Sequence, residues 1–111
     1  MNLKNTSILY SAFPALYHEV SPGFCCGDGW FQLLWYLSSA LSAHEAVITN
    51  VKAKFGSLQV HVRNPTEVVN NLIHEVQLAS LCTCQDCGLY THRHDFKIPV
   101  YCPCGKQLGQ V

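Results

Sequence analysis

The strongest constraint on this 111-residue chain comes from its seven cysteines, five of which lie in the last thirty residues. An odd number of cysteines in tight clusters argues against a secreted disulfide scaffold, because such scaffolds pair their cysteines. The same pattern favours metal binding in a reducing compartment. We therefore expect a metal-binding protein of the cytoplasm. The five clustered residues are Cys82, Cys84, Cys87, Cys102 and Cys104.

Four of these cysteines form two close pairs. Cys84 and Cys87 have the CxxC spacing of a zinc knuckle, and Gly88 follows them, where such a turn needs positive φ. Cys102 and Cys104 are separated by one residue and are also followed by glycine. Four thiolates suit tetrahedral Zn²⁺, so these two pairs are the predicted ligands of one structural zinc ion.

The fourth ligand stays open on sequence grounds, because the closing pair is one residue shorter than CxxC. Cys82, His92 and His94 are spare candidates for it. An iron–sulfur cluster is a weaker competitor for the same thiolates. Catalytic zinc is disfavoured, since all-cysteine sites are usually closed to water. Metal-free buried cysteines would explain one or two such residues, but not five flanked by glycines.

The segment before the cysteine cluster begins with a predicted irregular stretch and a helix. Residues 1–27 carry prolines and glycines at intervals that favour irregular structure. A helix is predicted from Asp28, whose carboxylate suits the N-cap, to about Ala43. Its core-facing stripe comprises Trp30, Leu33, Leu34, Leu37 and Leu41.

A second apolar stripe on this helix consists of Phe31 and Trp35, spaced i, i+4. Burying one aromatic side chain stabilises a protein by roughly 1.5–3 kcal/mol, so both rings should be covered. The cover is either the N-terminal segment, with Phe13, Leu16 and Tyr17, or a second copy of the chain. The two alternatives are about equally expected. The homodimer is slightly favoured, because two chains with a net charge near zero repel each other little.

A hairpin and another helix follow. Apolar and polar residues alternate over residues 47–63, which predicts two strands joined at Gly56-Ser57. An amphipathic helix is predicted over residues 65–81, with Asn64 or Thr66 as its cap. An isolated hairpin is marginal in water, so both helices should pack on one face of it.

The predicted fold class is therefore α+β, in the order helix, β-hairpin, helix, C-terminal zinc ribbon. Residues 1–81 form the core and residues 82–111 the ribbon, packed together as one compact unit. Only 13% of the residues are charged and 49% are hydrophobic, which excludes a disordered chain. No stretch reaches the roughly 18 apolar residues of a membrane span, so no membrane partner is expected.

Cys26 raises the question of a thiol enzyme. At a helix N-terminus the helix dipole would lower its pKa and make the thiol reactive. No general base is identifiable beside it, and neither a phosphate-binding glycine loop nor a Ser-His-Asp pattern is present. Simple packing of Cys26 is therefore preferred, and the protein is expected not to be an enzyme.

Three motifs together resemble a known family. The order CGDGW, then VKAKFGSLQ, then CxxCG with a closing cysteine pair is similar to small, largely uncharacterised zinc-ribbon proteins of phages and prophages. Their motifs read GDGW, VKEKFGGLR and CxxC…CxxC. The likeness spans residues 13–105, but Ala53, Ser57 and Gln59 replace the Glu, Gly and Arg of that family. The resemblance implies a phage setting, in the cytoplasm of a bacterial host, and a shared fold; it implies no activity.

The leading functional hypothesis is a non-enzymatic phage accessory protein that binds an unidentified host or phage protein. Small phage proteins of this kind often block bacterial defence, for example CRISPR-type nucleases. A thiol-dependent enzyme that uses Cys26 is the third hypothesis.

The second hypothesis is nucleic-acid binding by the ribbon. Its support is weak, because the few cations of the ribbon alternate with acidic residues. The residues of that basic-aromatic face would be Tyr90, His92, Arg93, Lys97, Tyr101 and Lys106.

Overall fold

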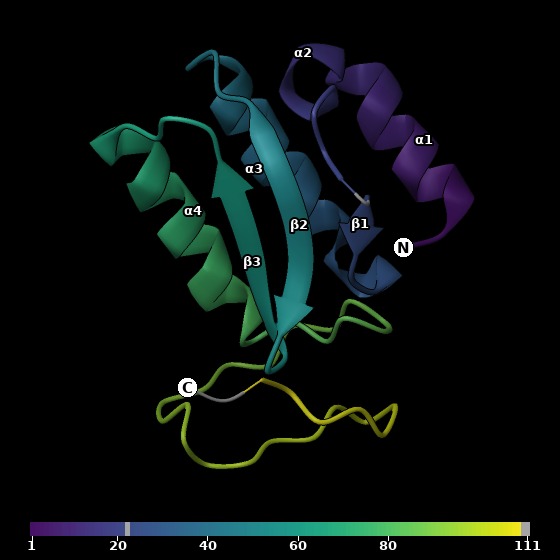
Figure 1. Cartoon of the computed structure of the whole chain (residues 1–111). Helices are drawn as coiled ribbons and strands as arrows, with labels where there is room; N and C mark the ends of the chain where they lie inside the picture. Colours follow the sequence, from purple (N-terminus) through teal and green to yellow (C-terminus); the bar gives the residue numbers. More distant parts are fainter. Residues whose placement is uncertain (22, 110–111) are drawn as a thin grey trace.

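A computed structural model describes residues 1–21 and 23–109. Helices and a three-stranded sheet make up an α+β fold, as predicted (Figure 1). Beyond residue 80, the described chain forms loops with two isolated antiparallel bridges. In chain order the elements are α1 (Leu3–Ala12), α2 (Pro14–Tyr17), β1 (Phe24–Cys25), the 3₁₀ turn η1 (Asp28–Trp30), α3 (Phe31–Ser42), β2 (Ile48–Lys54), β3 (Ser57–Val62) and α4 (Glu67–Ser80).

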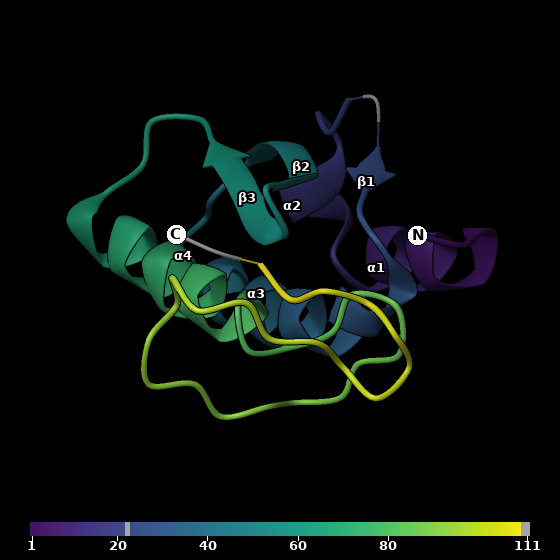
Figure 2. The same cartoon turned by 90° about the horizontal axis from the view of Figure 1, so that it is seen from below.

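The sheet has the order β1-β2-β3, with β1 parallel to β2 and β2 antiparallel to β3. Helices α3 and α4 lie together on one face of the sheet, as viewed from below (Figure 2). The apolar core is formed by side chains of the helices and of the sheet. Its side chains that are at most 1% exposed include Leu9, Tyr17, Trp30, Leu34, Leu37, Leu41, Ile48, Val51 and Leu58.

The N-terminal segment is helical, which corrects the prediction of an irregular stretch. Asn2 caps α1 by accepting a hydrogen bond from the backbone N–H of Asn5 at 2.8 Å. Leu9, Leu16 and Tyr17 are buried, so tertiary packing stabilises helices that are too short to be stable alone. The sequence signal was hidden because Pro14 reads as a helix breaker, whereas it occupies the first turn of α2.

Asp28 does not cap the helix that follows it, contrary to the sequence prediction. No side chain caps α3, and Gly27 precedes the 3₁₀ turn that leads into it. The Asp28 carboxylate instead accepts hydrogen bonds from the Asn2 backbone N–H at 2.8 Å and the Asn5 side chain at 3.2 Å. It therefore ties the start of the chain to the start of the 3₁₀ turn.

Within the chain, the second apolar stripe of α3, Phe31 and Trp35, is partly covered. The rings of Phe13 and Trp35 meet edge to face with centroids 5.0 Å apart, and Phe31 lies 6.2 Å from Trp35. Trp35 remains 38% exposed. The N-terminal segment thus contributes a cover, as one of the two alternatives expected. The contacts of one chain do not test the homodimer.

The hairpin turns at Phe55 and Gly56, one residue earlier than predicted, and both residues have positive φ, 54° and 73°. A register shift at Thr49 places one extra residue on β2. This bulge reverses the inside and outside of the strand before it, so Ile48 is buried together with Val51. Simple alternation had put these two residues on opposite faces.

The last helix agrees with its prediction, within the usual uncertainty of helix ends. Thr66 caps α4 by accepting from the backbone N–H of Val69 at 3.2 Å. Val69 and Val76 pack into the core. None of the helices in the described part of the chain is long and apolar enough to cross a membrane.

Candidate metal centre

The first cysteine pair lies on a tight loop that directly follows α4. An antiparallel bridge between Thr83 and Tyr90 closes the loop. Inside it, the Cys84 N–H donates to the Leu89 carbonyl at 2.9 Å, and the Gly88 N–H donates to the Cys84 carbonyl at 2.8 Å. Gly88 has a φ of 81°, which a residue with a side chain rarely adopts. We call this loop, residues 83–90, the first knuckle.

The second pair lies on a similar loop, residues 101–107, here called the second knuckle. A bridge between Tyr101 and Gln107 closes it. The Cys102 N–H donates to the Lys106 carbonyl and the Gly105 N–H donates to the Cys102 carbonyl, both at 2.8 Å. Each of these bonds spans one residue fewer than its counterpart in the first knuckle. The turn of the second knuckle is therefore tighter, which accommodates a C-x-C pair one residue shorter than CxxC.

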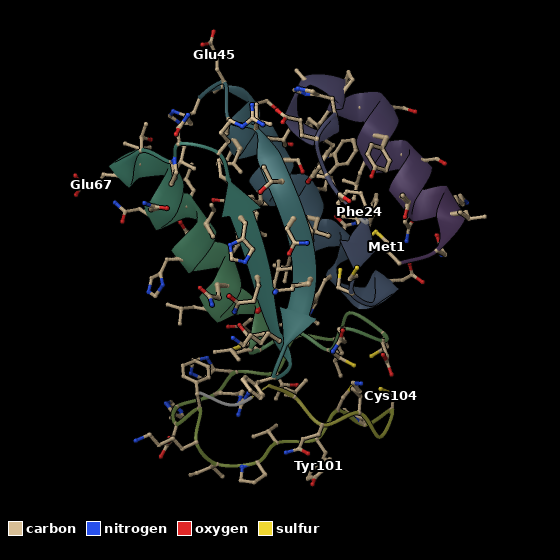
Figure 3. All side chains as sticks on the ribbon, viewed as in Figure 1. Met1, Phe24, Glu45, Glu67, Tyr101 and Cys104 are labelled. Atoms are coloured by element: carbon tan, nitrogen blue, oxygen red, sulfur yellow. The ribbon has the colours of Figure 1, made fainter. Side chains whose placement is uncertain are left out.

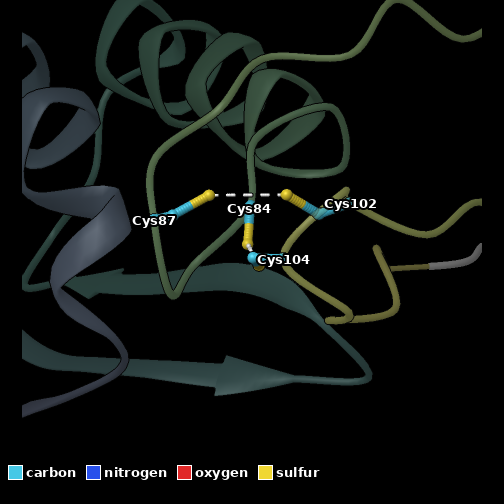
Figure 4. Close-up of side chains that lie close together, drawn as sticks. All are labelled: Cys84, Cys87, Cys102 and Cys104. Atoms are coloured by element: carbon cyan, nitrogen blue, oxygen red, sulfur yellow. Dashed lines mark hydrogen bonds between the residues drawn. The ribbon is translucent and has the colours of Figure 1, made fainter.

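The two knuckles bring four thiols together, those of Cys84, Cys87, Cys102 and Cys104 (Figure 4). All four sulfur atoms lie within 4.8 Å of one another. Between the two knuckles, the Sγ atoms of Cys84 and Cys104 are 3.5 Å apart, and those of Cys87 and Cys102 are 3.4 Å apart. A disulfide would need about 2.05 Å, so the thiols are unpaired.

These distances fit a tetrahedral metal ion. With Zn–S bonds of about 2.3 Å, the sulfur atoms of a regular tetrahedron are about 3.8 Å apart. The observed separations fall on both sides of this value. Four sulfur donors with tetrahedral spacing are a donor set that zinc prefers. The cluster could therefore bind a metal ion such as zinc.

The backbone of the first knuckle also favours the thiolate form that binds metals. Burial opposes ionisation of the Cys84 thiol, but backbone N–H groups of Cys87 and Asp86 stabilise its anion and lower its pKa to about 7. At Cys102 the Cys104 N–H acts in the same direction. Burial and the neighbouring thiols outweigh it and raise the pKa of Cys102. Neighbouring thiolates repel one another, and a divalent metal would relieve that repulsion.

The CGDGW motif packs closely against the backbone of the first knuckle. The Gly29 N–H donates to the Gln85 carbonyl at 2.8 Å, and the Trp30 indole N–H donates to the Thr83 carbonyl at 2.9 Å. A Cβ on Gly27 or Gly29 would overlap the backbone of the knuckle. The two glycines are therefore needed for close approach.

Arg93 connects the segment between the knuckles to the rest of the chain. It is only 7% exposed. Its guanidinium donates to four backbone carbonyls, including that of Leu81 at 2.6 Å and that of Ile98 at 3.0 Å. The other two belong to Phe96 and Gly109. This corrects the sequence interpretation of Arg93 as a surface cation available to nucleic acid.

The spare ligand candidates lie outside the four-thiol group. Cys82 is buried. The rings of His92 and His94 pack edge to face with centroids 4.7 Å apart. Distance along the chain could not separate these residues from Cys104, because the geometry of the second knuckle depends on how its turn closes.

Cys26 does not have the low pKa of a reactive thiol. Its side chain is buried, and the loss of hydration raises its pKa to about 11, outweighing the opposite effect of the N-terminal ammonium group. It leads into a 3₁₀ turn and packs in the apolar core. Burial, and not the helix dipole considered from the sequence, therefore dominates the pKa of this thiol.

The fold and the four-thiol group define an α+β protein with a site suited to a metal ion such as zinc. Comparison with protein-family models, curated proteins and solved structures gives no match.

Proposed function

We propose that Cys84, Cys87, Cys102 and Cys104 bind one structural Zn²⁺ ion. The observation that carries this proposal is the convergence of four thiols from two knuckles, all within 4.8 Å of one another. When bound, the zinc would supply folding free energy by joining the two knuckles. Four protein ligands fill a tetrahedral shell and leave no position for a substrate or an activated water.

In this proposal residues 82–111 are a zinc ribbon that packs on the core of residues 1–81 as one unit. The support comes from contacts between the two parts. Trp30 and Gly29 hold the first knuckle, and Gly109 packs against Gly56 at the hairpin turn. Each knuckle of the ribbon thus lies close to a different part of the core.

We further propose a non-enzymatic function, the binding of a macromolecule. A closed thiolate shell and a buried Cys26 thiol with a pKa near 11 both argue against catalysis. Aromatic rings remain on the surface, among them Trp35 at 38% and Tyr36 at 51% exposure. A host or phage protein as partner, and interference with a bacterial defence, rest on the resemblance of the sequence motifs alone.

Nucleic-acid binding through the ribbon, the second hypothesis, loses support from the burial of Arg93. Of the three cations expected on that face, Lys97 and Lys106 remain, and Asp86 and Asp95 belong to the same segment. Without Arg93, that face alone attracts phosphates only weakly.

The zinc proposal is tested by native mass spectrometry of the purified chain. We expect about one zinc per chain, released by a chelator together with the structure of the C-terminal segment. Single replacement by serine of Cys84, Cys87, Cys102 or Cys104 should remove most of the zinc. Cys82→Ser is the matched control, because Cys82 is a neighbouring cysteine outside the group; it should keep a full equivalent. Equal zinc in all these variants would contradict the assignment.

The binding proposal is tested by affinity capture from lysate of bacteria, with and without phage infection. The zinc-loaded, tagged chain should retain a partner in stoichiometric amount, and the zinc-deficient Cys84→Ser variant should retain less. A wild-type chain that captures nothing beyond the Cys84→Ser background would argue against this function.

A further inference from the structure

The tip of the β2–β3 hairpin carries a surface that neither the core nor the metal centre uses. Phe55 at this tip is 82% exposed. Two grooves, of about 680 Å³ and 420 Å³, meet at Phe55. The larger lies against the second knuckle and the smaller against α4. We call Phe55 and the linings of these two grooves the hairpin-tip surface.

Phe55 occupies a backbone position that suits other residues better. With φ of 54° at Phe55 and 73° at Gly56, the turn has positive φ at both central residues. Such hairpin turns favour Asn-Gly, and an aromatic residue there is strained. A strained, exposed ring costs stability and contributes nothing to the core. This combination is typical of a residue kept for binding.

The polar residues of the surface are lysines, glutamines, Ser57 and His74. Lys54 and Lys106 line the grooves, and the Lys54 ammonium lies 5.9 Å from the centre of the Phe55 ring. Neither lysine forms an ion pair within residues 1–21 and 23–109. No Asp or Glu lines either groove. Four of the six glutamines of the chain do: Gln59, Gln77, Gln85 and Gln107.

Two of the seven acidic residues, Glu45 and Glu67, lie at the end of the molecule opposite to Cys104, whereas the hairpin turn lies at the Cys104 end (Figure 3). Asp86 and Asp95 belong to the C-terminal segment but line neither groove. Lys52 is exposed two residues before Lys54 on β2 and therefore on the same face of the strand. Three lysines that form no ion pair in the described part of the chain thus lie on or beside a surface without acidic lining.

We propose that the hairpin-tip surface binds single-stranded nucleic acid, with a base stacked on Phe55. An exposed ring stacks on any base, lysines attract the phosphates, and glutamine amides can hydrogen-bond to base edges. An acidic peptide would match the lysines but would leave the ring without a planar partner. Paired bases in a duplex are stacked on one another and cannot cover the ring. This surface shares Lys106 with the ribbon face that the sequence suggested but is centred on Phe55, and it adds a ligand to the protein partner proposed above.

The proposal is tested by fluorescence anisotropy with labelled single strands of about 12 nucleotides, a length within the usual site sizes. DNA and RNA strands of one mixed sequence should both bind, because the surface contacts what the two share. Phe55→Asn should weaken binding by about 5- to 150-fold, which corresponds to the loss of one stacked base. This variant should fold at least as well as wild type, since Asn-Gly suits the turn. Tyr36→Ala removes another exposed ring, which lies outside both grooves, and should leave nucleic-acid binding unchanged.

Salt dependence gives a second, independent readout. Three phosphate contacts predict a slope of log affinity against log salt of about −2, and Lys54→Gln or Lys106→Gln should each reduce it by about 0.7. The proposal is wrong if Phe55→Asn binds as well as wild type, if a duplex of the same sequence binds equally, if polyglutamate binds in preference to the strands, or if no strand binds at low salt. Zinc content is measured separately without nucleic acid, so a failure of the zinc proposal is distinguishable from a failure of this one.

Discussion

Arg93 shows at the scale of one residue how burial changes the meaning of a charge. In the sequence it belongs to a short basic-aromatic stretch, but in the fold four backbone carbonyls accept its hydrogen bonds. Its guanidinium also faces the ring of Phe96 at 5.3 Å. No carboxylate of residues 1–21 and 23–109 pairs with it. A buried guanidinium that binds only carbonyls serves to hold loops together, because its rigid fork can donate in several directions.

Replacement of Arg93 by methionine should therefore destabilise the protein without affecting the zinc ligands. Leaving a buried acceptor unpaired costs roughly 1–3 kcal/mol, so with partial relaxation we expect a loss of about 2–4 kcal/mol in the free energy of unfolding. Arg93→Lys keeps the charge but loses the fork and should fall in between. Urea-induced unfolding in the presence of zinc measures both variants. An unfolding midpoint of Arg93→Met equal to that of wild type would show that these hydrogen bonds contribute nothing.

The glycines of CGDGW matter for a different reason from those of the knuckles. Gly88 and Gly105 have φ values of 81° and 100°, which the turns require. Gly29 has none of this strain; its missing Cβ leaves room for the carbonyl of Cys84. One residue type thus meets a conformational need in one motif and a packing need in the other.

At the scale of elements, the hairpin connects the core to the proposed ribbon. A Cβ on Gly56 would lie 2.6 Å from the Cα of Gly109, so the turn and the end of the described chain are in close contact. The Leu58 N–H donates to the Ser80 hydroxyl at 2.9 Å, which joins β3 to the end of α4. The strand, the helix and the C-terminal segment therefore meet at one end of the sheet. The grooves of the hairpin-tip surface lie at this junction, which explains why residues far apart in the sequence line them.

At the scale of the whole molecule, the second apolar stripe of α3 predicts self-association. Phe13 covers Trp35 from one side, but 38% of the Trp35 side chain remains accessible, and Phe31 is only partly buried. A second copy of the chain could bury the rest, and the net charge of zero opposes such pairing little.

Accordingly, we expect the wild-type chain to sediment as a dimer at tens of micromolar and the double variant Phe31→Glu, Trp35→Glu to sediment as a monomer. Tyr36→Glu is a useful control, because it adds charge to the same helix outside this stripe. A monomeric wild type would mean that the N-terminal helices are the complete cover of α3. It would leave the zinc and nucleic-acid proposals unaffected, since neither involves this face.

Local sequence patterns were enough to predict the α+β class, the positions of the hairpin and of its flanking helices, and the cysteines expected to form a group. Each of these depends on local pattern: period two in the strands, helical spacing in α3 and α4, and short distances between cysteines followed by glycine. Thr66 could be named as one of two caps because capping involves only neighbouring residues.

Features that depend on contacts between distant residues could not be predicted from these local patterns. The bulge at Thr49, the helices formed by the first seventeen residues and the burial of Arg93 all depend on partners far along the chain. The position of Cys104 beside Cys84, while Cys82 and the two histidines lie outside the group, depends on how the second knuckle closes and where it packs. Local patterns cannot contain this information, because the free energy of each arrangement comes from surfaces that meet only after folding.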